Sequence, residues 1–165
     1  MWDRPPGLSI FRRRAPRRGN TFLEVAFVLV PLLALLLGIL DFGFAIFLRT
    51  TFQHAVREGV RYAVTYQTST GLGHDASIKR VVQNQAMGFL SDSDLAQKVK
   101  IRYYQANTMS ESNENSPGNL IEISVENYQY GWMAPLMRSA VPLNIVVRAS
   151  DRMEGLAGGM SPPGR

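Results

Sequence analysis

RRGNTFLEVAFVLVPLLALLLGILDFGFAIFL is the sequence of residues 17–48, and this stretch decides the fold. After residue 21 its only formal charges are Glu24 and Asp41. As a helix, the apolar part would be roughly 40 Å long at 1.5 Å per residue, against about 30 Å for the hydrocarbon core of a bilayer. The stretch is too long and too apolar for an ordinary secretory signal, and no small-residue cleavage site follows a short apolar core. It therefore predicts a transmembrane segment at about residues 22–48.

The residues before this stretch carry the excess positive charge. Residues 1–18 contain six arginines and one acid, which accounts for the whole net charge of +5, and the rest of the chain is neutral. The high isoelectric point is therefore poor evidence for nucleic-acid binding. An arginine-rich terminus can be a solvated tail, but directly before an apolar span it better fits a positive-inside signal that keeps the N-terminus cytoplasmic. The arginines nearest the span are Arg12, Arg13, Arg14, Arg17 and Arg18.

The helical pattern continues beyond the apolar stretch. Pro31 lies inside the span and removes one backbone donor, which predicts a modest kink near residues 28–31. Beyond Arg49, apolar residues recur at three- and four-residue intervals with charged residues between them. These residues are Phe52, Ala55, Val56, Gly59, Val60 and Ala63. The pattern predicts one helix from about residue 20 to 67, apolar on all sides first and amphipathic later, ended by the glycine-rich residues 68–73.

The remaining chain predicts a small extracytoplasmic α+β domain over residues 68–154. A second helix is expected from Asp75, acting as its cap, to about Leu90. Alternation of apolar and polar residues predicts three strands, at residues 98–105, 120–128 and 142–150. The polar residues 106–119 predict a long hairpin connection or mobile loop, and the Gly- and Pro-rich residues 155–165 predict a disordered tail. We expect the amphipathic half of the long helix to pack on the antiparallel sheet.

The residues around the start of the span resemble a known family. Gly19 followed by Glu24, in RRGNTFLEVA, is similar to the class III leader and cleavage site of type IV pilin-like proteins. Residues 24–43 more specifically resemble the TadE-like pseudopilins of the Tad (tight adherence) pilus system, and residues 55–63 fit the same family. Asn20 after the glycine and the early proline favour the Tad branch over a type II secretion pseudopilin. The subtype, TadE or its relatives TadF and TadG, stays open.

The resemblance implies a pilin-like fold and a role in the biogenesis of a Tad-type (type IVc) pilus. A prepilin peptidase would cut between Gly19 and Asn20, releasing the leader, residues 1–19. The product would be a single-pass protein of the bacterial cytoplasmic (inner) membrane with its C-terminal domain extracytoplasmic. The implied partners are the prepilin peptidase, the major pilin, a companion pseudopilin, Tad inner-membrane assembly proteins and the lipid bilayer. Whether the chain enters the fibre or stays at its base is open.

Glu24 is the residue expected to act in assembly. Cleavage would create a positive α-amino group on Asn20, one helical turn before Glu24 on the same face. Pairing with that amine, in the same or a neighbouring subunit, would offset the cost of a carboxylate in lipid, about 2.5–3.5 kcal/mol at mid-bilayer. The alternative is a carboxylate at the level of the lipid headgroups, which needs no partner.

The other polar residues predict no enzyme. The chain has no cysteine, and no nucleophile motif, phosphate-binding loop or paired carboxylates can be recognised, so we expect neither catalysis nor a cofactor or metal. His54 and His74 are expected at the surface or at a helix cap, and Asp41 and Arg49 at the far boundary of the span. Residues 132–137 are expected to cover the sheet rather than lie on the membrane.

Two other functions would fit an anchored domain. One is an uncleaved single-pass protein whose outer domain is a binding or tethering module. The other is a membrane-anchored hydrolase, which would need a cleft of convergent polar groups that the sequence does not indicate.

Overall fold

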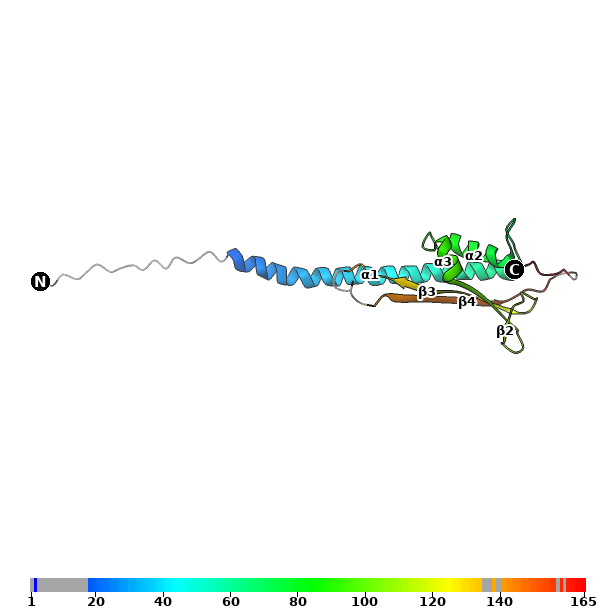
Figure 1. Ribbon diagram of the computed structural model, residues 1–165. Coiled ribbons are helices and arrows are strands. Elements are labelled where there is room, and N and C mark those ends of the chain that lie inside the picture. The colour runs from blue at the N-terminus through cyan, green and yellow to red at the C-terminus, as the bar shows by residue number, and fades with distance from the viewer. Residues whose placement is uncertain (1, 3–17, 135–137, 139–140, 157, 159) are drawn as a thin grey trace. The chain divides into compact units, whose positions relative to one another are not determined.

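The structure is a computed structural model that describes residues 2, 18–134, 138, 141–156, 158 and 160–165 (Figure 1). The chain forms two compact units, the first up to Leu36 and the second from Leu37 onward. Helix α1, Arg18–Val64, contributes to both units and is close to the predicted helix of residues 20–67. The long apolar helix followed by an antiparallel sheet confirms the predicted α+β fold.

The second unit contains a four-stranded antiparallel sheet in the order β2-β1-β3-β4. Its strands are β1 (Val99–Tyr104), β2 (Glu111–Ser112), β3 (Leu120–Tyr130) and β4 (Leu143–Arg152). β1, β3 and β4 correspond to the three predicted strands, and their alternation places Ile101 opposite Ile123 and Val125 opposite Val147. β2 lies within the polar connection and pairs with the end of β1, so that this connection is partly ordered as a strand.

The predicted second helix is present but shorter than expected, and a further short helix follows beyond its predicted end. α2 spans His74–Gln85 and α3 spans Asp92–Gln97. α2 ends before Leu90 because Met87 and Gly88 both have positive φ, a conformation that interrupts a right-handed helix. Gly73, not Asp75, is the N-cap of α2.

A capping box starts α3. The Ser91 side chain accepts a hydrogen bond from the backbone N–H of Asp94, whose carboxylate accepts one from the Ser91 N–H. The hydrogen bond from the Lys98 side chain, followed by those from Ser91, lowers the pKa of Asp94 to about 2. Residues 91–94, Ser-Asp-Ser-Asp, therefore form a helix N-terminus whose signature is present in the sequence, although no helix was predicted there.

The core lies between the sheet and a layer formed by α1 and α2. α1 faces β3 and β4, since the rings of Phe52 and Tyr128 are 4.7 Å apart and the Gln53 side chain donates a hydrogen bond to the Arg148 carbonyl. α2 reaches β1, where the Tyr103 hydroxyl donates to Asp75 at 2.8 Å. The fully buried residues include Phe52, Ala55, Val56, Ile78, Val82, Val99, Ile121, Ile123 and Val125. The amphipathic half of the long helix thus packs on the sheet as predicted.

Gly59 allows α1 and α2 to approach closely over β3. A Cβ atom at this position would lie 2.6 Å from Cγ2 of Val82 and 3.3 Å from Cδ1 of Ile123. Val82 is fully buried, and a β-branched side chain has few rotamers with which to move aside. By contrast, a Cβ atom at Gly43 would have no neighbour within 4 Å.

We expect Gly59→Ala to destabilise the outer domain and Gly43→Ala to leave it unchanged or slightly more stable. Overpacking costs about 1–3 kcal/mol, and the better helix propensity of alanine offsets about 1 kcal/mol of this cost, which leaves a net loss of up to about 2 kcal/mol. Thermal unfolding followed by circular dichroism in detergent would measure both variants. A Tm for Gly59→Ala equal to that of the unmodified chain would contradict this packing.

Candidate functional site: the N-terminal helix and the Asp41 cradle

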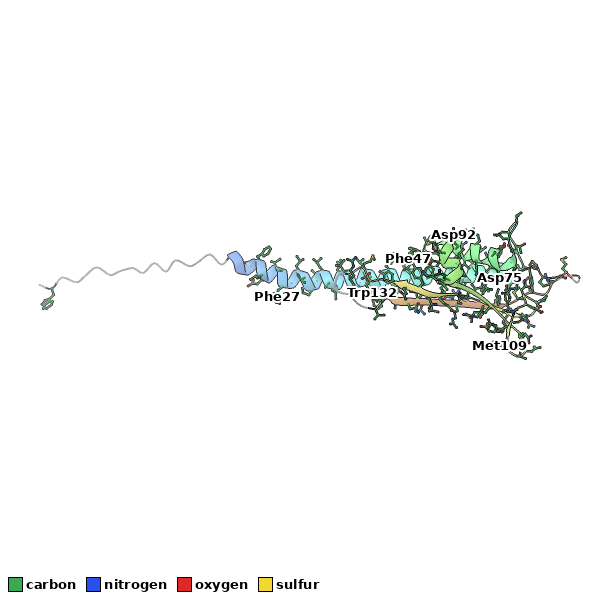
Figure 2. All side chains as sticks on the ribbon, viewed as in Figure 1. Phe27, Phe47, Asp75, Asp92, Met109 and Trp132 are labelled. Carbon is green, nitrogen blue, oxygen red and sulfur yellow. The ribbon has the colours of Figure 1, made fainter. Side chains whose placement is uncertain are left out.

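The first part of α1 is a helix without a protein covering. From Thr21 to Leu40 every residue is exposed or half-buried, and Phe27, which projects from the helix in Figure 2, is 84% exposed. Within the part of the chain that the structure describes, this is the one helix long and apolar enough to cross a membrane. So large an exposed apolar surface requires lipid or other apolar helices around it. It is compatible with a single-pass membrane anchor.

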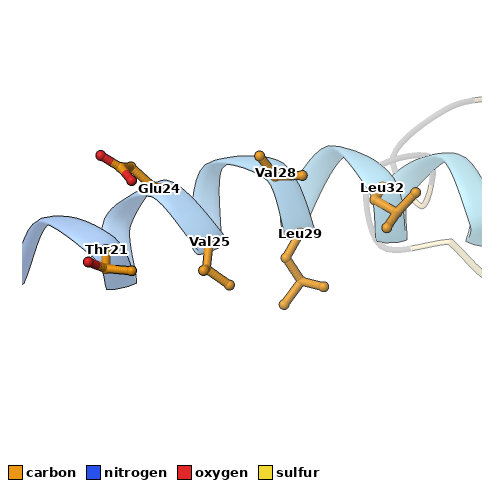
Figure 3. Close-up of a pocket in the computed structure, with 6 residues that line it drawn as sticks. All are labelled: Thr21, Glu24, Val25, Val28, Leu29 and Leu32. Atoms are coloured by element: carbon orange, nitrogen blue, oxygen red, sulfur yellow. The ribbon is translucent and has the colours of Figure 1, made fainter.

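Glu24 lies on this apolar surface. Figure 3 shows it on the same helical segment as Thr21, Val25 and Val28, which line a shallow groove together with Leu29 and Leu32. The backbone of Gly19 and Asn20 already belongs to α1, so that Asn20 lies one helical turn before Glu24. Pro31 also lies inside α1, and the helix assignment continues through it. Of the leader arginines, Arg18 begins the helix, and Arg12, Arg13, Arg14 and Arg17 lie outside the described residues.

Asp41 is the second carboxylate of the segment, and its surroundings are quite different. It is 1% exposed, and its carboxylate accepts three hydrogen bonds from residues at and after the end of β3. The donors are the Tyr130 hydroxyl at 2.7 Å and the backbone N–H groups of Met133 at 3.0 Å and Ala134 at 2.7 Å. We call these four residues the Asp41 cradle. Asp41 was expected only to mark the boundary of the span, whereas in the structure it ties α1 to the outer domain.

Aromatic side chains surround the cradle. The Trp132 ring lies 6.1 Å from that of Phe42 and 5.8 Å from that of Tyr130, and Phe44 lies 5.8 Å from Tyr130. The Trp132 indole N–H donates to the Val141 carbonyl at 3.1 Å. Trp132, which is half-buried, thus covers the end of the helix–sheet junction, whereas Met133 is exposed. This packing shields the Asp41 hydrogen bonds from water and strengthens them. Residues 135–137 lie outside the described residues, so the expectation that residues 132–137 cover the sheet stays a prediction for the segment as a whole.

A second polar cluster lies at the opposite end of the outer domain. The Arg165 guanidinium binds the Asp75 carboxylate at 2.8 Å and lies 4.8 Å above the Tyr103 ring. The backbone of the same tail is held as well, because the His74 N–H donates to the Gly164 carbonyl and the Asn115 side chain to the Pro163 carbonyl. The last three residues of the tail therefore have defined partners, although the composition of residues 155–165 predicts disorder.

His74 was expected at the surface or at a helix cap, but it is fully buried in this second cluster as the first residue of α2, whose N-cap is Gly73. Its ring stacks on that of Tyr66 at 5.9 Å. Burial lowers the pKa of His74 and outweighs the nearby Asp75 carboxylate, which acts to raise it. The folded domain therefore favours the neutral imidazole.

Replacing Asp41 should loosen the residues that follow β3. Asp41→Asn weakens the acceptor for two backbone N–H groups, and leaving such a group unpaired costs about 1–3 kcal/mol. We expect amide hydrogen exchange at Met133 and Ala134 to become about 5- to 150-fold faster. Tyr130→Phe is the matched control, because it removes only the hydroxyl donor and should leave these two amides protected. Unchanged exchange in Asp41→Asn would mean that the cradle does not hold this segment.

Acidification should destabilise the outer domain through His74. Folding lowers the pKa of His74. The stabilisation that results is complete above the pKa of the unfolded state, about 6.5, and is lost as the pH falls through the pKa of the folded state. We expect the free energy of unfolding to fall below pH 6.5, with a slope of up to about 1.4 kcal/mol per pH unit. Urea unfolding at several pH values would measure it. His74→Asn should flatten the dependence, and His54→Gln, at an exposed histidine, should preserve it.

Comparison with known proteins shows a family resemblance of the N-terminal helix. The sequence model of the TadE-like protein family matches residues 19–61, from the glycine of the expected processing site into the amphipathic half of α1. Neither the curated proteins nor the solved structures gave a match. Both Glu24 and Asp41 lie within the matched segment, whereas all the strands lie outside it. The match confirms the predicted resemblance of this helix to the TadE-like family.

Proposed function

We propose that this chain is a minor pilin or pseudopilin that acts in the assembly of a Tad-type pilus. Its role is associative and not catalytic: α1 anchors the chain in the bacterial cytoplasmic membrane and packs there against other pilin-like helices. The proposed partners are the prepilin peptidase, those pilin-like subunits and the Tad assembly proteins of the inner membrane. The outer domain faces away from the cytoplasm, since the arginines precede the span.

The observation that carries this proposal is an uncovered apolar helix with one carboxylate near its start, in a segment that matches the TadE-like family. Lipid tails solvate such a helix well, and a carboxylate in lipid is stabilised by a positive group placed beside it. Cleavage between Gly19 and Asn20 would supply one, as an α-amino group one turn away. A new N-terminus of one subunit meeting Glu24 of the next would also set the axial register of neighbouring helices.

One observation favours the uncleaved alternative. α1 begins at Arg18, so the bond between Gly19 and Asn20 lies in the first helical turn, whereas a protease needs an extended chain. The first turn of a helix frays readily because its N–H groups lack intrahelical partners, and Gly19 favours the fraying. The bond between Gly19 and Asn20 therefore becomes accessible to a protease when the first turn opens. If the bond is not cut, the chain is a tethered outer domain.

Intact-mass measurement on the protein purified from pilus-producing cells distinguishes the two. We expect a mass that corresponds to a chain beginning at Asn20, and a retained leader in cells lacking the prepilin peptidase. A leader still attached in cells with active peptidase would overturn the processing step and leave the tether as the function.

The assembly role is tested by Glu24→Gln, which removes the charge and keeps the shape. We expect normal cleavage but at least a tenfold loss of co-purifying pilin-like subunits and of surface pili, equivalent to about 1.4 kcal/mol of association free energy. Glu111→Gln, at an exposed position on β2, is the matched control and should behave like the unmodified chain. Full piliation with Glu24→Gln would contradict the pairing of this carboxylate.

A further inference from the structure

An apolar patch surrounds the end of the outer domain from which the chain continues into the membrane span. Its members share one property, an apolar side chain beside the Asp41 cradle, and they are Phe42, Ile46, Trp132, Met133, Val141 and Leu143. Val141 is 86% exposed, and Met133 is 62% exposed. We call these six residues the membrane-proximal patch. Figure 2 shows Trp132 at the opposite end of the second unit from Met109, in the turn between β1 and β2.

The patch is one connected surface of the second unit. The rings of Phe42 and Trp132 are in contact, and the Trp132 indole is bonded to the Val141 carbonyl. Phe42, Ile46 and Leu143 line a common groove between α1 and β4. Two segments that are about 90 residues apart in the sequence thus build a single exposed apolar surface, where a water-soluble domain would carry polar residues.

The position of Asp41 along α1 indicates what covers this surface. Residues 22–40 make 19 residues of helix, and 19 residues correspond to about 28 Å, close to the roughly 30 Å of a hydrocarbon core. If Glu24 lies at the cytoplasmic boundary, Asp41 lies about 26 Å along the helix from it, so the far boundary falls within about one turn beyond Asp41 and its cradle. Tryptophan and tyrosine are enriched at this depth in membrane proteins, because their rings have an apolar body and a polar edge. Trp132, half-buried beside the cradle, meets that description.

The charges near the patch fit the same environment. Asp41 is the acid at this end, and its three hydrogen bonds remove it from the surface. Arg49, which is exposed, lines the groove with Phe42 and Leu143, about two helical turns beyond Asp41. The Arg49 guanidinium, on its long side chain beside the apolar patch, can bind the phosphates of lipid headgroups.

We infer that the membrane-proximal patch sits in the outer lipid–water interface of the membrane. Trp132 and Met133 enter the boundary between headgroups and acyl chains, and Arg49 contacts the phosphates. The outer domain therefore rests on the bilayer instead of standing above it on a free stalk. This inference goes beyond the proposed function: it requires that α1 spans the membrane but does not depend on cleavage or on pilin partners.

The depth of Trp132 can be measured by fluorescence, since the chain has only two tryptophans, Trp2 and Trp132. The full chain carrying Trp2→Phe would be inserted into phosphatidylcholine–phosphatidylglycerol vesicles that contain lipids brominated at shallow or deep acyl positions. We expect a blue-shifted emission that shallow bromines quench more strongly than deep ones. As the matched control, Trp2→Phe with Trp132→Phe and Met109→Trp places the probe at the opposite end of the domain, where neither lipid should quench it.

Each other outcome overturns the inference in a recognisable way. A chain that does not float with the vesicles would show that α1 does not anchor it in the membrane. Floating chains whose Trp132 is quenched by aqueous acrylamide but by no brominated lipid would show a domain held above the membrane. Quenching by neither would show that a protein surface, such as a second copy, covers the patch.

A second variant tests the apolar character of the patch itself. Val141→Asp changes an exposed position that makes no core contact, so the fold should be retained, as circular dichroism can check. A carboxylate placed there should move the membrane-proximal patch away from the acyl chains and reduce the quenching of Trp132 by shallow bromines. Unreduced quenching in a folded Val141→Asp protein would contradict burial of the patch in lipid.

Discussion

The structure depends on a single helix that must suit two surroundings. From Val25 to Leu40, α1 is apolar on all sides, and beyond Asp41 the residues that it buries lie against the sheet and α2. Asp41 stands at this change. Its carboxylate takes donors from the end of β3 and from the two N–H groups that follow, which fixes the point on α1 at which the outer domain begins. An acid left there without donors would carry a large desolvation cost.

The two carboxylates of the TadE-like segment show how differently the same chemistry can be used. Glu24 is exposed on an apolar helix, on a surface that lipid or other apolar helices must cover. Asp41 is buried, and three groups of its own chain satisfy it. One carboxylate is therefore suited to association, and the other to holding the chain's own parts together.

Local patterns accounted for most of the elements. The three- and four-residue spacing from Phe52 to Ala63 predicted the buried face of α1, and alternation predicted β1, β3 and β4 with the correct faces. The capping box at Ser91 is a local sequence signal from which α3 could have been predicted. β2 has only two residues, too few to show an alternation of apolar and polar side chains. The Asp41 and Arg165 contacts join residues about 90 positions apart, and no local pattern encodes such a pair. Glu24 was singled out because its partner is expected within one helical turn.

The Asp41 cradle also has a mechanical consequence. Tension that reaches the outer domain along α1 enters at its first buried residue, where three hydrogen bonds connect the helix to the end of β3 and to the segment after it. β3 is paired on both sides, with β1 and β4, so the load passes into the middle of the sheet and is shared between two ladders. The domain is thereby built to resist peeling of α1 from the sheet when its anchor is pulled.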